Sequence, residues 1–256
     1  MKQHHAQAPN KPPTTPPKGN QVHVWLMFHD KLQTPPQLAT SPLLNEQERL
    51  RQQRFVTPEL QYRFQCRREM LRRSLTVYRP DIGESDWIFT LNPYGKPQIH
   101  PAQSQNQLYF NLSHTNGLTV LAISAYEECG IDIENTAVNR PSSYLDIADR
   151  FFTEPESEQI KQGSTDAQIQ RFFDFWTLKE AYIKAVGKGL SLGLDRFQFA
   201  LEPASPIAIE FPSPAIDNAN TWVFHQETIG EDWRLAIALR AESSEPISCE
   251  FAHYPA

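Results

Sequence analysis

Apolar residues recur at a helical spacing in two stretches of the chain, one in each half. These residues are Leu60, Phe64, Leu71 and Leu75 in the first stretch, and Phe172, Trp176 and Ile183 in the second. The second pattern predicts a helix from about Ala167 to Val186, with Gly187 as its C-terminal stop. Each half of the chain is therefore expected to contain one long helix with an apolar face.

Shorter stretches between and after these helices have the character of strands. Residues 86–99 predict a strand, a turn and a returning strand, and residues 108–124 predict two strands joined at Asn116-Gly117. Residues 221–228 and 233–242 predict a final hairpin. This mixed order of helices and strands indicates an α+β fold.

A short motif occurs once in each half of the chain. QRFVTPE spans residues 53–59 and DRFFTEPE spans residues 149–156, and each is followed by a predicted helical segment. The half-chain offset predicts two similar α+β halves packed face to face as a pseudo-dimer. We expect a disordered tail over residues 1–20, an N-terminal half over 21–127 and a C-terminal half over 128–256.

The composition is typical of a chain that buries a sizeable core in a reducing compartment. Hydrophobic residues make up 39% of the 256 positions. Cys66, Cys129 and Cys249 lie far apart, which argues against a disulfide framework, and they show no metal-ligand spacing. Residues 1–20 contain no apolar secretion signal, and no stretch is long enough to span a membrane. We therefore expect a soluble, cytoplasmic protein.

Positive charge is concentrated in one block. The net charge is -6, yet residues 49–79 contain nine arginines against Glu59 and Glu69, so this block carries +7. Such a block indicates an anionic ligand or, alternatively, a solvated basic helix. Ser113 and His114 are expected at the entrance of a loop, where they could either meet an anion or serve as ordinary turn residues.

Each predicted helix places a charged residue within its apolar stripe. Arg68 lies in the stripe of the first helix, and Glu180 lies in that of the second, one turn before Lys184. A buried charge needs a partner, a metal or a ligand. If the two helices meet at a cleft, Arg68 and Glu180 line it together; a salt bridge between the halves is the alternative.

The stretch GIDIEN at residues 130–135 places two carboxylates on one side of a predicted strand. Ile131 and Ile133 point to one face, so Asp132 and Glu134 point together to the other. With Glu180 they form an all-oxygen set, which suits Mg²⁺ or Mn²⁺. The sequence therefore predicts a divalent cation at this strand.

The chain resembles the Sfp-type 4'-phosphopantetheinyl transferases. The resemblance rests on G130-I-D-I-E134, W176-T-L-K-E-A-Y-I-K184 and K188-G-L-S191, with Y94-G-K-P97 and F110-N-L-S-H114 upstream. These motifs occur in the family's order and cover the chain from about Phe55 to Phe199. The resemblance implies transfer of the phosphopantetheine arm of coenzyme A to a serine of a carrier protein, with release of 3',5'-ADP. It also implies a pseudo-dimer of α+β halves with the active site in the cleft between them, in agreement with the repeated motif.

The resemblance also implies roles for individual residues. Asp132, Glu134 and Glu180 match the Mg²⁺ ligands, and Glu180 also matches the residue that takes the serine proton. The positions that match coenzyme A contacts are Lys184, His114, Lys96, Ser113 and Arg63, with Arg68 as an alternative to Arg63 at the 3'-phosphate.

The expected partners are coenzyme A and an apo acyl carrier protein, peptidyl carrier domains, or both. We expect a monomer that binds neither nucleic acid nor membrane. Two other functions remain open: a Mg²⁺-dependent nuclease or phosphohydrolase that uses the same carboxylates, and a non-catalytic module that binds carrier proteins.

Overall fold

The computed structural model describes residues 13–32, 38–104, 107–137, 143–202, 205–213 and 216–255. Its helices are α1 (Glu46–Gln53), α2 (Pro58–Tyr78), α3 (Tyr144–Phe151), α4 (Glu154–Ile160) and α5 (Thr165–Val186). Its strands are β1 (Gln21–Phe28), β2 (Phe89–Leu91), β3 (Pro97–Ile99), β4 (Tyr109–Thr115), β5 (Leu118–Ser124), β6 (Cys129–Asn135), β7 (Gln198–Ala200), β8 (Ala208–Glu210), β9 (Trp222–Ile229), β10 (Trp233–Arg240) and β11 (Ser248–His253). The predicted α+β class is confirmed. Residues 1–12 of the predicted tail lie outside the described residues.

Two sheets form the centre of the molecule. The first sheet has the strand order β11-β1-β5-β4, and the second has the order β6-β10-β9. β1 pairs in parallel with β11, whereas the other neighbours in both sheets are antiparallel. β2–β3 and β7–β8 form two small additional hairpins.

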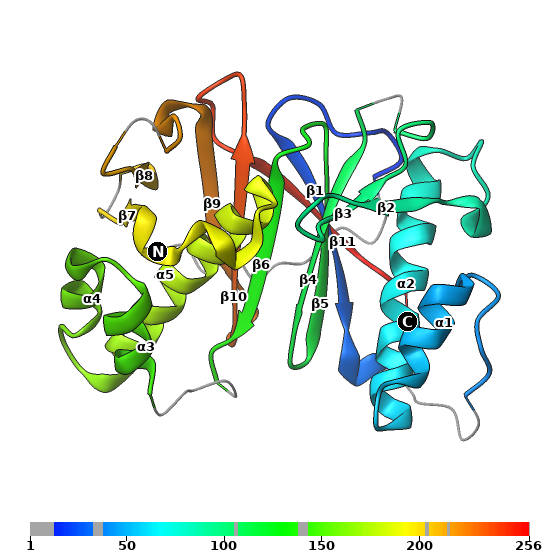
Figure 1. Ribbon diagram of the computed structural model, residues 1–256, viewed down its shortest axis with the longest axis horizontal. Coiled ribbons are helices and arrows are strands. Elements are labelled where there is room, and N and C mark those ends of the chain that lie inside the picture. Colours follow the sequence, from blue (N-terminus) through cyan, green and yellow to red (C-terminus); the bar gives the residue numbers. More distant parts are fainter. Residues whose placement is uncertain are drawn as a thin grey trace.

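Helices cover the outer faces of these sheets, and the inner faces pack against each other. In Figure 1, α1 and α2 lie on one side of the sheets and α3, α4 and α5 on the other. The inner layer joins Val22, Val24, Val120, Ile131 and Ile237, all buried, from both sheets. Burial of these apolar faces supplies the main stabilisation of the layered fold.

Both predicted long helices are present. The helix that directly follows each motif begins at a threonine cap. Thr57 of the first motif accepts the Leu60 N–H at the start of α2. Thr153 of the second motif begins α4, where its N–H donates to the Glu156 carboxylate at 3.1 Å. The long helix α5 starts only at residue 165, so the parallel between the two motifs holds at their caps and not in the length of the helices that follow.

Two predictions about the strands need correction. The hairpin of β9 and β10 is present but is not the last element, because β11 follows it and pairs with β1. Ser113 and His114 lie within β4 rather than at the entrance of a loop. Their side chains therefore point to opposite faces of the strand. No helix among the described residues is long and apolar enough to cross a membrane.

Candidate active site

The strand β6 places Asp132 and Glu134 on the face that the GIDIEN pattern predicts. Ile131 and Ile133 belong to the inner core layer. Asp132 therefore faces the opposite side, toward α5, where it is 4% exposed. Two carboxylates on the helix-facing side of a buried strand need compensation from neighbouring groups.

Gly130 allows α5 to approach β6 closely. A Cβ atom at this position would lie 2.0 Å from the Ala181 carbonyl oxygen and 2.5 Å from the Ala185 nitrogen. Both are backbone atoms, so no side-chain rotation could relieve the contact. The glycine thus brings Glu180 and Lys184, which lie on either side of Ala181 along α5, to the carboxylates of β6.

Gly130→Ala is expected to destabilise the protein by roughly 1–3 kcal/mol or more, because α5 must move away from β6. Chemical denaturation measures this change. Gly83→Ala is the matched control, since its Cβ would meet only the side chain of Asp86, which can rotate away. Equal effects of the two substitutions would contradict the close approach of α5.

Lys184 forms its ion pair with Asp132 and not with Glu180, the partner that an i, i+4 spacing favours. Its Nζ donates to Asp132 Oδ1 at 2.6 Å and to Ser113 Oγ at 2.8 Å. Ser113 Oγ also donates to Asp132 Oδ1 at 2.9 Å. Side chains from α5 and β4 therefore both donate hydrogen bonds to one carboxylate oxygen on β6.

The second oxygen of Asp132 supports a cation site. Oδ2 of Asp132 is buried and has no hydrogen-bond partner. Such an unsatisfied acceptor is costly unless a ligand compensates it. Glu134, two residues on, accepts a hydrogen bond from Thr115 Oγ1 at 3.1 Å. Together with Glu180 these residues offer only oxygen donors, the kind that Mg²⁺ and Mn²⁺ prefer, but the carboxylate oxygens of the three residues do not all lie within 4.8 Å of one another.

Glu180 has a strongly perturbed carboxyl group. Burial is the largest cause, and the negative charges of Asp132 and Glu134 add to it, so that the pKa of Glu180 rises to about 7. Lys184 acts in the opposite direction. A carboxyl group with a pKa near neutrality can accept and release a proton at physiological pH, which is a requirement for a general base.

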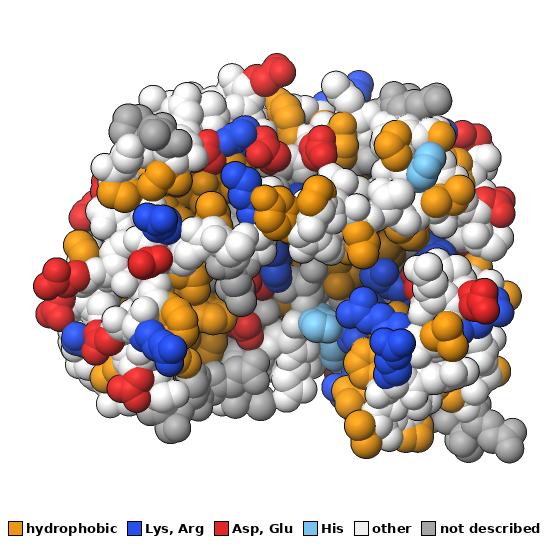
Figure 2. Space-filling model, viewed as in Figure 1, with side chains coloured by type: hydrophobic (Ala, Val, Ile, Leu, Met, Phe, Trp, Pro, Cys, Tyr) orange, Lys and Arg blue, Asp and Glu red, His pale blue; other side chains and the backbone are white. Residues whose placement is uncertain are grey.

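A basic cluster of His29, Arg63, Arg67 and His114 lies beside these carboxylates. Burial, followed by the charges of Arg63 and Arg67, lowers the pKa of His29 to about 4. Burial, then mainly the charge of Arg67, lowers the pKa of His114, which is also influenced by Lys184 and Asp132. His114 thus connects the basic cluster with the Asp132 site. Figure 2 shows Lys and Arg side chains gathered beside a His side chain at the hollow between the two sides of the molecule.

Within this cluster, Arg67 is the arginine best placed to bind an anion. Burial and the charges of Arg68 and Arg63 lower its pKa to about 10, so it stays charged at neutral pH. Among the described residues, no carboxylate forms an ion pair with Arg67, whereas Arg63 pairs with Glu59. Sequence reasoning missed Arg67 and His29. The i, i+4 spacing of Arg63 and Arg67 could have indicated the former, but no pattern marks His29.

Arg68 is directed away from Glu180. Its guanidinium lies 3.6 Å from Glu48 of α1, which also accepts two hydrogen bonds from Arg72. The apolar stripe of α2 thus meets α1 at this position, and the expected pairing of Arg68 with Glu180 across a cleft is not found.

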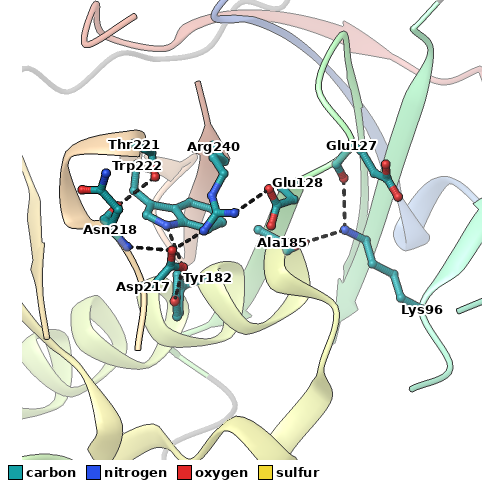
Figure 3. A network of polar contacts seen from close by, with 10 residues as sticks. All are labelled: Lys96, Glu127, Glu128, Tyr182, Ala185, Asp217, Asn218, Thr221, Trp222 and Arg240. Carbon is teal, nitrogen blue, oxygen red and sulfur yellow. Dashed lines mark hydrogen bonds and ion pairs between the residues drawn. The ribbon is translucent and has the colours of Figure 1, made fainter. Parts of the chain in front are cut away.

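Lys96 is held by three backbone carbonyls, one at the C-terminal end of α5 and two at the start of β6 and just before it. Its Nζ donates to the carbonyls of Ala185 at 2.8 Å, Glu127 at 3.2 Å and Cys129 at 3.3 Å. Figure 3 shows two of these contacts beside a second network centred on Arg240. Lys96 lines a cavity of about 690 Å³ in this region. As the structure stands, its ammonium group orients α5 instead of reaching the Asp132 site.

A smaller pocket of about 270 Å³ joins the predicted motifs. Tyr94, Gly95, Lys96 and Pro97 line it from one side, and Glu180, Lys184, Gly187 and Gly189 line it from α5 and the loop that follows. Segments separated by some ninety residues thus meet beside Glu180. The Glu180 carboxyl group and the Lys184 ammonium group both line this pocket. An ammonium group beside carboxylate oxygens suits a ligand that carries phosphate groups.

Comparison with known proteins identifies the family. Residues 128–238 match the model of the 4'-phosphopantetheinyl transferase superfamily. The chain is 30% identical over 245 residues to the 4'-phosphopantetheinyl transferase HetI of Nostoc sp., covering 95% of this chain and 97% of HetI. It is 34% identical over 182 residues to the 4'-phosphopantetheinyl transferase Sfp of Bacillus subtilis, covering 66% of this chain and 77% of Sfp. The chain therefore belongs to the 4'-phosphopantetheinyl transferase superfamily, and the predicted membership is confirmed.

Proposed function

We propose that the protein transfers the 4'-phosphopantetheine arm of coenzyme A to a serine of an apo carrier protein and releases 3',5'-ADP. The observation that supports this most directly is the convergence of Asp132, Glu180 and Lys184 beside a basic cluster that could bind the phosphates of coenzyme A. Membership of the family supports the same reaction.

Asp132, Glu134 and Glu180 would hold a Mg²⁺ ion, with Mn²⁺ as an alternative. When bound, the ion would neutralise negative charge on the coenzyme A pyrophosphate. The unsatisfied Oδ2 of Asp132 supports its assignment as a ligand. Glu134 shares its carboxylate with Thr115, so it would be the more weakly held ligand of the three.

Glu180 would act as the general base. The serine oxygen attacks the β-phosphorus of coenzyme A while Glu180 accepts the hydroxyl proton, and the bond from this phosphorus to the bridging oxygen of the pyrophosphate breaks. The electron pair of that bond leaves with 3',5'-ADP. Lys184 and His114 would stabilise charge on the phosphate oxygens, and Ser113 would hold Lys184 and Asp132 in position.

Arg67 and Arg63 would bind the 3'-phosphate. We expect Arg67→Ala to raise the KM for coenzyme A by about tenfold to a hundredfold, the loss of one charge-assisted hydrogen bond, while the KM for dephospho-coenzyme A changes little. Arg63→Ala should have a smaller effect, because Glu59 shares its guanidinium.

Arg68→Ala is the matched control for these substitutions, since it removes a charge of the same helix whose partner is Glu48. Steady-state kinetics with both coenzymes measures the preference for the 3'-phosphate. If only Arg68→Ala lost that preference, the 3'-phosphate site would have to be assigned to the Arg68 face of α2 instead of the Arg67 face.

The arrangement of two central sheets, each with a long outer helix, supports the proposal of a pseudo-dimer. Under this proposal the acidic set belongs mainly to the C-terminal half and the basic cluster to the N-terminal half, so the carrier would dock where the two meet. Acyl carrier proteins and peptidyl carrier domains are both proposed as partners of a monomeric enzyme.

A product analysis distinguishes transfer from hydrolysis. With coenzyme A, Mg²⁺ and an apo carrier, one 3',5'-ADP should appear for each carrier modified, and none should appear without the carrier. Steady release of nucleotide in the absence of carrier would instead indicate a phosphohydrolase.

A further inference from the structure

A group of potential metal ligands lies at the edge of the two central sheets that is remote from the active site. β9 is the edge strand of the second sheet opposite β6, and β11 is the edge strand of the first sheet opposite β4. His225 and Glu227 come from β9, and Cys249 comes from β11. The active-site carboxylates, by contrast, come from β6 and α5.

All three side chains point into the layer between the sheets. His225 and Glu227 share a face of β9 with Val223 and Ile229, which contact the inner core. Cys249 packs against the same core and lies beside Val22 of β1. Two positions on β9 that the alternating pattern would fill with apolar side chains are therefore occupied by an imidazole and a carboxylate.

The ligand atoms of these residues are already close together. His225 Nε2 lies 3.1 Å from Glu227 Oε1. One ligand atom from each of His225, Glu227 and Cys249 falls within 4.8 Å of the other two, and among the described residues no other three His, Cys, Asp or Glu side chains form such a group. All three residues are half-buried, so the site is partly accessible to water.

We propose that His225, Glu227 and Cys249 bind a borderline-soft divalent cation, with Zn²⁺ as the physiological ion. Imidazole, carboxylate and thiolate are the donors that Zn²⁺ uses in proteins, whereas the all-oxygen set at Asp132 suits Mg²⁺. The cation takes Nε2 of His225, Oε1 of Glu227 and the Cys249 sulfur. The thiol proton leaves to solvent, and water completes a tetrahedral set.

Without a cation the cluster favours the neutral thiol of Cys249, so a cation must displace the thiol proton when it binds. Burial and the nearby charge of Glu227 raise the pKa of the Cys249 thiol, so the thiol is protonated without a cation. A divalent cation would replace the repulsion between thiolate and carboxylate with attraction to both. Binding should therefore release one proton and strengthen as the pH rises through the neutral range.

The site would connect two segments that share no strand pairing. β11 pairs with β1, and β9 pairs with β10, so a cation shared by Cys249 and His225 would bridge the two sheets. It would tie the C-terminal strand to the second sheet. Because the three ligands come from two strands that are distant in sequence, the spacing of the cysteines could not have revealed the site.

Cobalt spectroscopy on the untagged full-length protein tests the proposal. Co²⁺ should bind one per chain with a near-ultraviolet sulfur-to-cobalt charge-transfer band, which the oxygen ligands at Asp132 cannot produce. Zn²⁺ should displace it. Cys249→Ser should abolish the band, and His225→Gln should weaken Zn²⁺ binding by at least about a hundredfold. Cys66→Ala, which removes a thiol on α2, is the matched control and should keep the band.

Zn²⁺ should also raise the melting temperature by roughly 5–10 °C at a concentration about a hundredfold above its Kd. Cys249→Ser should lose this shift while it keeps transferase activity with Mg²⁺. Absence of the charge-transfer band in the wild-type protein, or a band that survives in Cys249→Ser, would overturn the proposal. Failure of the transferase assay with a normal band would overturn the proposed function alone.

Discussion

Asp132→Ala is expected to lower the rate of carrier modification by at least about a thousandfold, the upper range for loss of one preorganised electrostatic group. Asp132 is the residue on which the site converges. Oδ1 accepts hydrogen bonds from Lys184 and Ser113, and Oδ2 is buried without a partner. The substitution removes both the proposed metal ligand and the group that orients Lys184.

The chain should stay folded when Asp132 is replaced. Lys184 keeps its contacts with Ser113 and the Ile131 carbonyl, and the repulsion between Asp132 and Glu180 is lost. Circular dichroism and thermal unfolding measure this directly. Glu231→Ala, which removes an exposed carboxylate in the turn between β9 and β10, is the control for loss of charge alone. Near-normal turnover of Asp132→Ala at low Mg²⁺ would contradict the assignment of this metal ligand.

Glu180→Gln is expected to reduce turnover by at least about a hundredfold, because the amide keeps the shape of the side chain but cannot accept the serine proton.

The same substitution has a separate consequence for the stability of the protein without metal. The Glu180 pKa is about 7 in the folded protein, raised from 4.5. The folded state therefore binds this proton more tightly than the unfolded state does.

The sign of the pH dependence follows from this difference. The stabilisation from protonated Glu180 is complete below about pH 4.5 and is lost as the pH rises through about 7. In a metal chelator, Glu180→Gln should melt close to wild type at pH 5 and above wild type at pH 8. A difference between the two proteins that stays constant over this range would show that the Glu180 pKa is not raised.

Local patterns predicted the elements that carry the site. Alternation in GIDIEN placed Asp132 and Glu134 on one face of β6, and the helical spacing of Phe172 to Ile183 placed Glu180 and Lys184 on α5. These features are local, since they depend only on the periodicity of a strand or a helix. The close approach of α5 to β6 is also encoded locally, in Gly130.

Contacts between distant segments could not be predicted in the same way. Lys184 pairs with Asp132 rather than with Glu180, its i, i+4 neighbour, because tertiary packing places the carboxylate of β6 beside the ammonium group. Arg68 forms an ion pair with Glu48 of α1, whereas Arg67 lies near His114. The pairing of β11 with β1 is likewise a long-range contact, and no turn motif in the sequence predicts it.

The most direct test of the proposed transfer is the intact mass of an apo carrier protein after incubation with this protein, coenzyme A and Mg²⁺. The carrier should gain the mass of one phosphopantetheine group at its acceptor serine, and Asp132→Ala should leave the carrier unmodified over the same time. A carrier that keeps its apo mass in the presence of the wild-type protein, whether or not coenzyme A is consumed, would contradict the account.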